Sequence, residues 1–372
     1  MRIILILAAL LCLHAAVAAD GGSPFPLQIE TRVSVAPTVF PSGGARYAVY
    51  ELYLTNFSGA PETLQRIEVL NGDDVASTVV ASFAGEKLGE LLQGVGAQLP
   101  KDHQLNAGAT AIAYMWIPFE SEARVPGRLR HRVVSANSSV EGAVVSTHGT
   151  ELRSLAPPVR GTGWMASDGP SNDVKNHHRR GVLVIDGHLA DSRRFAVDWM
   201  MQKNGESASG DPHNVHSYYA YEQPLYAVGD ATVVTAHDGQ PDNVPSWGDA
   251  FRPAVPITMQ TVGGNHITLD LGGGQYAWYF HLRPGSVRVK VGEHVRRGQI
   301  LGNIGCSGDA RVPHLHFEVT TSAVLLAGEG LPYLIDHFRV WNEDKAWEAR
   351  SQELPLDGML VDFGVSDPNS GL

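Results

Sequence analysis

The sequence predicts an all-β protein of two domains. Short runs rich in Val, Ile, Tyr and Thr recur along the chain, and clusters of Gly, Pro, Asn and Asp separate them. A length of 372 residues also favours two domains over one. Paired prolines followed by glycines mark a linker between two patterned regions. We expect a first domain at 20–155, a linker at 156–163, a second domain at 164–345 and a C-terminal tail at 346–372.

The first nineteen residues have the pattern of a signal peptide. A positively charged start precedes an apolar run at 3–13, and a small-residue cleavage site follows at 16–18. The apolar run is too short to span a bilayer, and no later stretch is apolar enough for a transmembrane segment. We therefore expect export to the periplasm or the medium. The mature chain keeps one cysteine, Cys306, which cannot form an internal disulfide and is expected to serve packing.

The first domain is predicted to be an antiparallel β-sandwich of the immunoglobulin-like kind, because several strand-like runs follow one another at short spacing. One short segment, 85–93, has a helical pattern. No group of chemically active residues stands out, and His103 and His131 are interpreted as surface side chains. The expected strands are 45–56, 64–70, 77–83, 110–119 and 128–134.

The second domain is predicted to be an antiparallel β-sheet or a barrel-like sheet. Long helices are missing from its pattern, which disfavours the α/β folds that carry most nucleotide chemistry. The glycines at 272–274 are expected to form a hairpin turn, because no helix follows them. The expected strands are 182–187, 193–199, 224–236, 265–271, 275–282, 286–295, 299–305 and 314–319.

Charge and histidine content narrow the possible functions. The chain has 28 Lys+Arg against 39 Asp+Glu, a net charge of −11, and no strongly basic block. Binding to nucleic acid or anionic lipid needs clustered positive charge, so neither is expected as a partner. Twelve of the 16 histidines follow Lys175, so the chemistry is expected in the second domain.

The motif HLHFEV contains the strongest local signal. His314 and His316 are two residues apart in a predicted strand, so both rings leave the same face, about 7 Å apart at the backbone. The two imidazoles could share a metal, or one could bind it while the other acts beside it. A catalytic zinc site normally has three protein ligands and an open position.

Two further ligands are suggested by a predicted hairpin over 178–198. With a turn at Gly187-His188, His178 lies opposite Asp198, so both side chains can reach one cation. His188 is an alternative ligand at the turn, and the loop at 213–216 is a second alternative. The same hairpin directs His177 to the other side of its strand.

Residues 163–335 resemble the lysostaphin-type zinc metallopeptidases, a family of exported bacterial cell-wall endopeptidases. The resemblance depends on segments that occur in the family's order: HHRR…RRFAVDW, then PLYAVGDATVV, then GNHITLDLGGGQYAWYFHLRPGSVRVKVGEHVRRGQILGNIGCSGDARVPHLHFEV. It does not extend to the first domain.

The resemblance implies one zinc ion per chain and a role for each residue of the site. Asp198 and His316 match metal ligands, His314 matches a catalytic histidine, and His281 of YFHL matches its partner. The family's other ligand is normally a histidine four residues before the aspartate, where this chain has Arg194. A branch with an inserted hairpin uses the histidine of HRR instead, which here is His178.

These features predict an exported zinc endopeptidase that cleaves peptide cross-links, and the resemblance implies that these lie in peptidoglycan. The chain has no HExxH motif, so its general base is expected to be His281 or His314, and imidazoles titrate near about 6.5. A degenerate binding module that regulates cell-wall hydrolases is the alternative. A zinc enzyme with another substrate is a third hypothesis. The sequence does not determine the oligomeric state.

Overall fold

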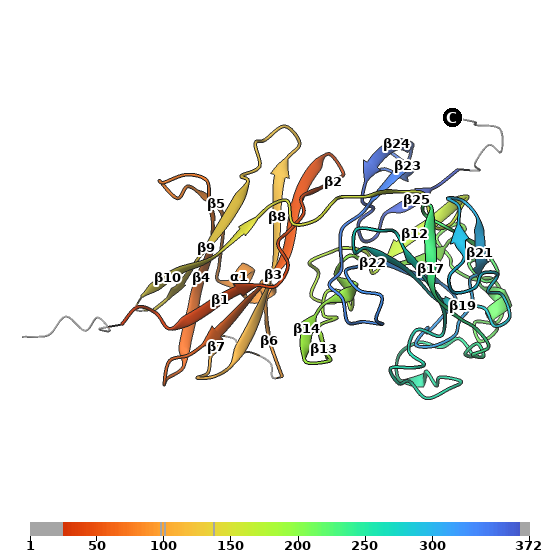
Figure 1. The fold of residues 1–372 in the computed structure, drawn as a ribbon, viewed down its shortest axis with the longest axis horizontal. Helices are drawn as coiled ribbons and strands as arrows, with labels where there is room; N and C mark the ends of the chain where they lie inside the picture. The colour runs from red at the N-terminus through yellow and green to blue at the C-terminus, as the bar shows by residue number, and fades with distance from the viewer. Residues whose placement is uncertain (1–24, 97–98, 100–101, 137, 365–372) are drawn as a thin grey trace, which may run out of the picture.

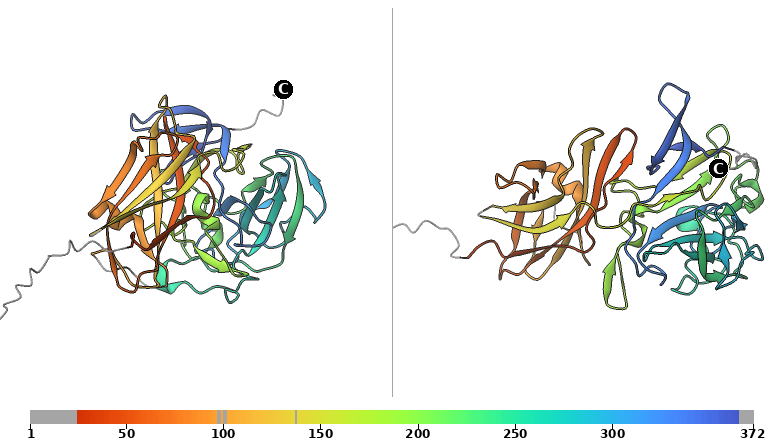
Figure 2. Two further views of the ribbon diagram at one scale, coloured as in Figure 1. Left: turned by 60° about the vertical axis from the view of Figure 1, so that its left-hand side comes forward. Right: turned by 45° about the horizontal axis from the view of Figure 1, so that its top comes forward.

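A computed structural model describes residues 25–364 except 97–98, 100–101 and 137, and it confirms the all-β prediction. Two regions lie side by side (Figure 1, Figure 2), one a β-sandwich and the other built on one large sheet. The predicted signal peptide at 1–19 lies outside the described residues. No helix within the described residues has the length and hydropathy to cross a membrane.

Two antiparallel sheets enclose the core of the N-terminal sandwich. The first contains β1 (Ile29–Val33), β3 (Ala45–Asn56), β8 (Thr110–Glu120) and β6 (Leu92–Gly94) in that order, with β2 (Phe40–Ser42) beside β3. The second contains β10 (Ser139–Ser146), β9 (Arg128–Ser135), β4 (Glu62–Asn71) and β5 (Val79–Ala84), with β7 (Gln104–Leu105) beside β4. A short helix, α1 (Glu86–Leu91), lies where the helical pattern predicted one.

His131 lies in the sandwich core, which corrects its interpretation as a surface residue. Alternate residues of β9 are buried, and this alternation places the His131 side chain inward at 0% exposure. Tyr50 donates to its Nε2 at 2.7 Å, and its Nδ1 donates to the Ala143 carbonyl at 2.8 Å. Both ring nitrogens are therefore satisfied by the neutral imidazole. Burial lowers the pKa of His131 to about 4.

One large sheet organises the C-terminal region. Its strands run in the order β11 (Ser154–Leu155), β23 (Leu334–Trp341), β25 (Leu360–Asp362), β12 (Thr162–Ser167), β15 (Val197–Met201), β22 (Leu315–Thr320), β19 (Tyr276–Leu282), β18 (Asn265–Asp270), β17 (Ala231–His237) and β20 (His294–Val295), with β24 (Trp347–Glu353) beside β23. The pairing is antiparallel except between β11 and β23. Two small sheets pair β13 (Leu183–Ile185) with β14 (His188–Ala190) and β16 (Pro224–Tyr226) with β21 (Ile300–Asn303).

Several predicted boundaries differ from the structure. The run 224–236 contains two strands, β16 and β17, which belong to different sheets. In 193–199, the first half belongs to a 3-10 helix, η1 (Ser192–Phe195), and the strand β15 begins at Val197. Most of 286–295 forms no strand before β20. The segment expected as a tail instead adds β24 and β25 to the sheet, where they pair with β23 and β12.

The core of the C-terminal region extends into the sandwich. Phe40 and Val49, from β2 and β3, belong to the same buried cluster as the large sheet. The Phe40 ring meets the Phe195 ring edge-on, with centroids 5.7 Å apart. Ser42 donates through its hydroxyl to the Leu354 carbonyl at 2.7 Å. Apolar burial and hydrogen bonds thus hold the two regions together.

Candidate metal centre

Asp198 lies at the middle of the site because of strand pairing. On β15 it is directly opposite His316 on β22, although 118 residues separate them in the chain. Cross-strand neighbours have side chains close enough to interact, and His316 Nδ1 lies 2.8 Å from Asp198 Oδ1. Both side chains are buried. The large sheet thus holds two of the predicted ligands in contact.

His178 reaches Asp198 from a loop, and not from the predicted hairpin. The hairpin spans only β13 and β14, where Leu183 pairs with Ala190 and the turn lies at Asp186-Gly187. His178 belongs to the loop at 168–182 between β12 and β13, and its Nε2 lies 3.5 Å from Asp198 Oδ1. The predicted proximity is therefore present, but the mirrored register that suggested it is wrong.

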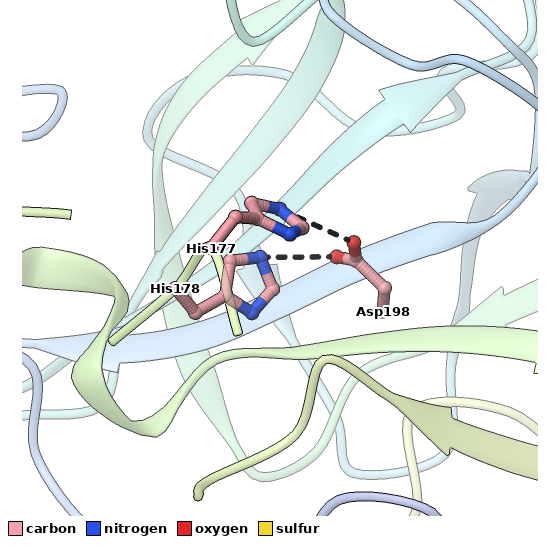
Figure 3. Close-up of side chains that lie close together, drawn as sticks. All are labelled: His177, His178 and Asp198. Atoms are coloured by element: carbon pink, nitrogen blue, oxygen red, sulfur yellow. Dashed lines mark ion pairs between the residues drawn. The ribbon is translucent and has the colours of Figure 1, made fainter. Parts of the chain in front are cut away.

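The loop also brings His177 to the site, contrary to the prediction that it faces away. His177, His178 and Asp198 offer ligand atoms that lie within 4.8 Å of one another (Figure 3). His177 Nε2 is 3.9 Å from Asp198 Oδ2, and its Nδ1 is 3.1 Å from Asp168 Oδ1. His177 is half exposed, whereas His178 is buried.

His281 and His314 form the other side of the cluster, with ring centroids 4.9 Å apart. His281 is the penultimate residue of β19 and has a φ of 66°, and its Nδ1 donates to the Ser307 carbonyl at 2.8 Å. His314 precedes β22, and its Nδ1 donates to the Val312 carbonyl at 2.7 Å. These bonds leave the Nε2 lone pairs free in the neutral tautomers, and His314 Nε2 lies 3.6 Å from Asp198 Oδ1.

Burial and charge set the protonation states in the cluster. Burial lowers the pKa of His178 to about 3. Burial and the nearby His314 hold the pKa of His281 well below its usual range. Burial would raise the pKa of Asp198, but the surrounding imidazoles hold it well below its usual range. Burial would lower the pKa of His316, but hydrogen bonds to two carboxylates raise it to about 9.

Two residues that the sequence did not single out orient the predicted ligands His316 and His178. His316 Nε2 lies 3.2 Å from Glu318 Oε2, and Glu318 is 1% exposed. His178 Nδ1 donates to the Asp168 carbonyl at 2.6 Å. Second partners of this kind fix the orientation of metal-binding imidazoles. The spacing of His316 and Glu318 by two residues on a strand was an available signal for the first, whereas only the loop fold reveals Asp168.

The donor set fits a zinc ion. His178 Nε2 is buried without a hydrogen-bond partner, although it faces a carboxylate. Two ligand atoms about 2.1 Å from one tetrahedral ion lie about 3.4 Å apart, close to the 3.5 Å between His178 Nε2 and Asp198 Oδ1. Neutral His178 and ionised Asp198 are the protonation states that a metal requires, whereas His316, whose pKa is raised to about 9, would release a proton on binding one.

The cluster lies in a cleft of about 340 Å³. All five predicted site residues line this cleft, together with His177 and Asp168. The rest of the lining is mostly apolar, with two arginines and one further aspartate: Arg193, Met200, Trp247, Val262, Gly263, Phe280, Asp309, Arg311, Val312, Leu325 and Leu326. Its size suits a peptide segment, and its polar groups gather at one place, as in typical ligand sites.

The alternative ligands lie elsewhere. His188 is exposed on β14, where it pairs with Ile185. His213 donates to the Pro245 carbonyl at 3.0 Å, and the His216 ring packs on Tyr221. Arg194, which occupies the place of the usual family ligand, is buried and reaches Glu51 of the sandwich.

Part of the C-terminal region is similar to proteins of known function. Residues 215–326 match the model of peptidase family M23. The C-terminal region contains a peptidase family M23 domain. The expected resemblance to the lysostaphin-type peptidases is confirmed. The match includes His281, His314 and His316 but begins after His178 and Asp198.

The curated relatives share a short segment with this chain. Lysostaphin of Staphylococcus simulans is 40% identical over 75 residues, which is 19% of this chain and 15% of lysostaphin. The glycyl-glycine endopeptidase ALE-1 of Staphylococcus capitis is 40% identical over 75 residues, 19% of this chain and 20% of ALE-1. The peptidoglycan DD-endopeptidase ShyC of Vibrio cholerae is 27% identical over 95 residues, 24% of this chain and 22% of ShyC. The chain thus spans between 15% and 22% of these relatives.

Solved structures with some similarity include the lysostaphin catalytic domain from Staphylococcus simulans. It is 23% identical, with a TM-score of 0.23, over 46% of this chain and 84% of that domain. A zinc-containing peptidase from Vibrio cholerae is 16% identical, with a TM-score of 0.25, over 77% of this chain and 82% of that one.

Proposed function

We propose that this chain is an exported zinc-dependent endopeptidase that hydrolyses peptide bonds in peptidoglycan. His178, Asp198 and His316 are the proposed ligands of one zinc ion. His281 and His314 are the proposed acid–base pair. The M23 match supports the peptidase activity, whereas the metal, the roles of the residues and the location are proposals.

One observation carries this proposal. The buried carboxylate of Asp198 lies among imidazoles that line a cleft with it, and the nearest loop imidazole, that of His178, has a buried Nε2 with no hydrogen-bond partner. A buried polar atom without a partner is costly, and a metal ion would supply the missing partner. A purely structural cluster would be expected to satisfy this nitrogen from the protein.

The residues of the site suit peptide hydrolysis. Zinc in such a site polarises a scissile carbonyl and lowers the pKa of a coordinated water towards about 7. His281 is neutral at neutral pH, and the Ser307 carbonyl fixes its tautomer so that Nε2 can accept a proton. His314 presents its Nε2 to the same space, since its Nδ1 donates to Val312. The pair can therefore take a proton from water and return one to the leaving amine.

The substrate class comes from the relatives. One matched relative is named a glycyl-glycine endopeptidase and another a peptidoglycan DD-endopeptidase. These names suggest peptide bridges of the cell wall as substrate, reached after removal of the predicted signal peptide at 1–19. We also propose two functional domains, a sandwich at 20–155 and a peptidase domain from 164, joined by the linker at 156–163.

The test measures zinc content and hydrolysis on the same preparations. Mature protein from Asp20 is expected to hold about one zinc per chain and to cleave a glycyl-glycine peptide or a D,D-cross-linked muropeptide, but not an unrelated folded protein. His178→Ala and Asp198→Ala should lose zinc. His281→Ala and His314→Ala should keep zinc but lose at least about 100-fold in kcat/KM.

The matched control is His337→Ala, which changes an exposed histidine on β23 and should alter neither quantity. Absence of zinc in reconstituted wild-type protein would contradict the metallopeptidase and favour a degenerate binding module. Zinc without cleavage of either cell-wall peptide would leave a zinc enzyme of another specificity.

A further inference from the structure

The sandwich contacts the site through the loop that carries His178. Arg194 of η1 is buried, and its guanidinium joins three segments of the chain. Its Nε donates to Glu51 Oε1 on β3 at 2.8 Å. Its Nη1 donates to the Ser171 carbonyl at 2.7 Å, and its Nη2 donates to Asn172 Oδ1 at 2.9 Å. One side chain therefore fixes the start of the loop to both the sandwich and the segment before Asp198.

A second arginine fixes the other end of this loop. Arg179, directly after His178, donates through Nη2 to the carbonyls of Glu90 and Leu91 at 2.5 and 3.3 Å. These are terminal carbonyls of α1 in the sandwich, groups that lack partners within a helix and attract a cation. The Arg179 guanidinium also lies over the Tyr114 ring of β8, 4.5 Å from its centroid.

The C-terminal region also holds the start of the loop: Asp357 Oδ1 accepts from the Gly169 amide at 3.2 Å, and the Asp357 amide donates to the Pro170 carbonyl at 3.3 Å. Residues 168–182 form turns and no strand or helix. Asn172 donates to the Tyr114 carbonyl at 2.9 Å, which adds a third contact with the sandwich. Within the loop, Asn176 accepts from the backbone amides of His178 and Arg179. Contacts from the N-terminal region thus hold the part of the loop that carries His178, at Asn172 and Arg179, whereas Asp357 holds the start of the loop.

We propose that the sandwich is a positioning element that holds the His177–His178 loop in its metal-binding geometry, through Arg194–Glu51 and through Arg179 on α1. Planar guanidinium groups suit this role because each makes several directed hydrogen bonds. In this chain an arginine occupies the place of the usual family ligand, and it anchors the replacement ligand loop instead. The zinc readout depends on the proposed function, whereas the placement of the loop does not.

The test compares two glutamates of the sandwich that are equally exposed. Glu51→Gln changes the partner of Arg194, and the Glu51 side chain is 12% exposed. Glu68→Gln is the matched control, because Glu68 is also 12% exposed but its ion pairs, with Arg66 and Arg132, lie within the sandwich. For each protein we would measure the zinc dissociation constant by chelator competition, and amide hydrogen exchange of residues 168–182 in metal-free protein.

Glu51→Gln is expected to raise the zinc dissociation constant about tenfold and to speed exchange in the loop, while Glu68→Gln changes neither. Arg179→Leu should act like Glu51→Gln, and Arg179→Lys should recover part of the effect because a lysine can still donate to the carbonyls of α1. These variants at a second contact decide the question if Glu51→Gln does not fold.

Unchanged exchange and zinc affinity in folded Glu51→Gln and Arg179→Leu would overturn the proposal. An equal effect of Glu68→Gln would also overturn it, because general loss of stability would then explain the result. If wild-type protein binds no zinc, the proposed function fails, and exchange in the loop alone decides whether the sandwich holds it.

Discussion

Replacement of Glu318 by glutamine is expected to weaken zinc binding about tenfold without altering the fold. Glu318 is 1% exposed, and its Oε2 accepts from His316 Nε2 at 3.2 Å. Glutamine keeps the shape and an acceptor oxygen but removes the charge. Hydrogen bonds to charged groups contribute about 1.5–3 kcal/mol and neutral ones about 0.5–1.5 kcal/mol, a difference of about 1–1.5 kcal/mol. Since 1.4 kcal/mol corresponds to a tenfold change, the zinc dissociation constant should rise about tenfold.

The assay is competition with a chromophoric zinc chelator at fixed pH. Glu318→Ala should have a larger effect, up to about 100-fold, because it also removes the acceptor. Thr320→Val is the control: Thr320 is buried two residues further along β22, and its hydroxyl bonds Trp278 and Ser322 instead of His316. Wild-type zinc affinity in Glu318→Gln would refute the argument that this carboxylate tunes His316.

Three further predictions concern protons and ligands. In the metal-free protein the pKa of His316 is raised to about 9, so zinc must displace a proton from this imidazole. Zinc binding at pH 7 should therefore release about one proton, and the apparent zinc affinity should fall about tenfold per pH unit below 9. Calorimetry in buffers of different ionisation enthalpy measures the number of protons released. His178→Ala should abolish zinc binding, whereas His177→Ala should leave most of it, as metal analysis of both variants would reveal. The pKa of His131 is about 4 in the folded protein and about 6.5 when unfolded. The unfolded state therefore binds more protons between these two pH values. About 3 kcal/mol of the free energy of unfolding, fully present above pH 6.5, should be lost as the pH falls to about 4. Urea unfolding of the wild type and of His131→Gln across this pH range measures the contribution, and parallel pH profiles of the two proteins would contradict it.

Local patterns predicted elements whose stability is mainly local. The run 45–56 contains three tyrosines, a valine and a threonine, which favour strands, and it forms β3 with the same ends. By contrast, 286–295 contains four valines, which also favour strands, but it pairs only at β20. A strand needs a partner with free backbone groups, and composition alone does not show whether one is present. The same reason applies to the segment expected as a tail: β24 pairs with the preceding strand β23, and β25 finds a partner in β12, which is distant in the chain.

The site was predictable to the extent that its residues follow strand geometry. His316 lies on β22 and Asp198 on β15, and both are where their motifs placed them. His178 was selected through a hairpin register that does not form, and its proximity to Asp198 comes from the loop at 168–182. The proximity of His177 to Asp198 could not be predicted from the sequence. Side chains alternate between two faces only on a strand, and His177 lies in a turn.

The sequence by itself determined the all-β class, the family of the C-terminal domain and the types of residue at the site, because these depend on local composition and on motifs in order. Only the tertiary structure decided which atoms meet. It placed Asp168 and Glu318 behind the imidazoles, and it turned Arg194 towards Glu51 of the sandwich. These contacts join residues that are distant in the chain, and their formation depends on how sheets and loops pack, which no local pattern encodes.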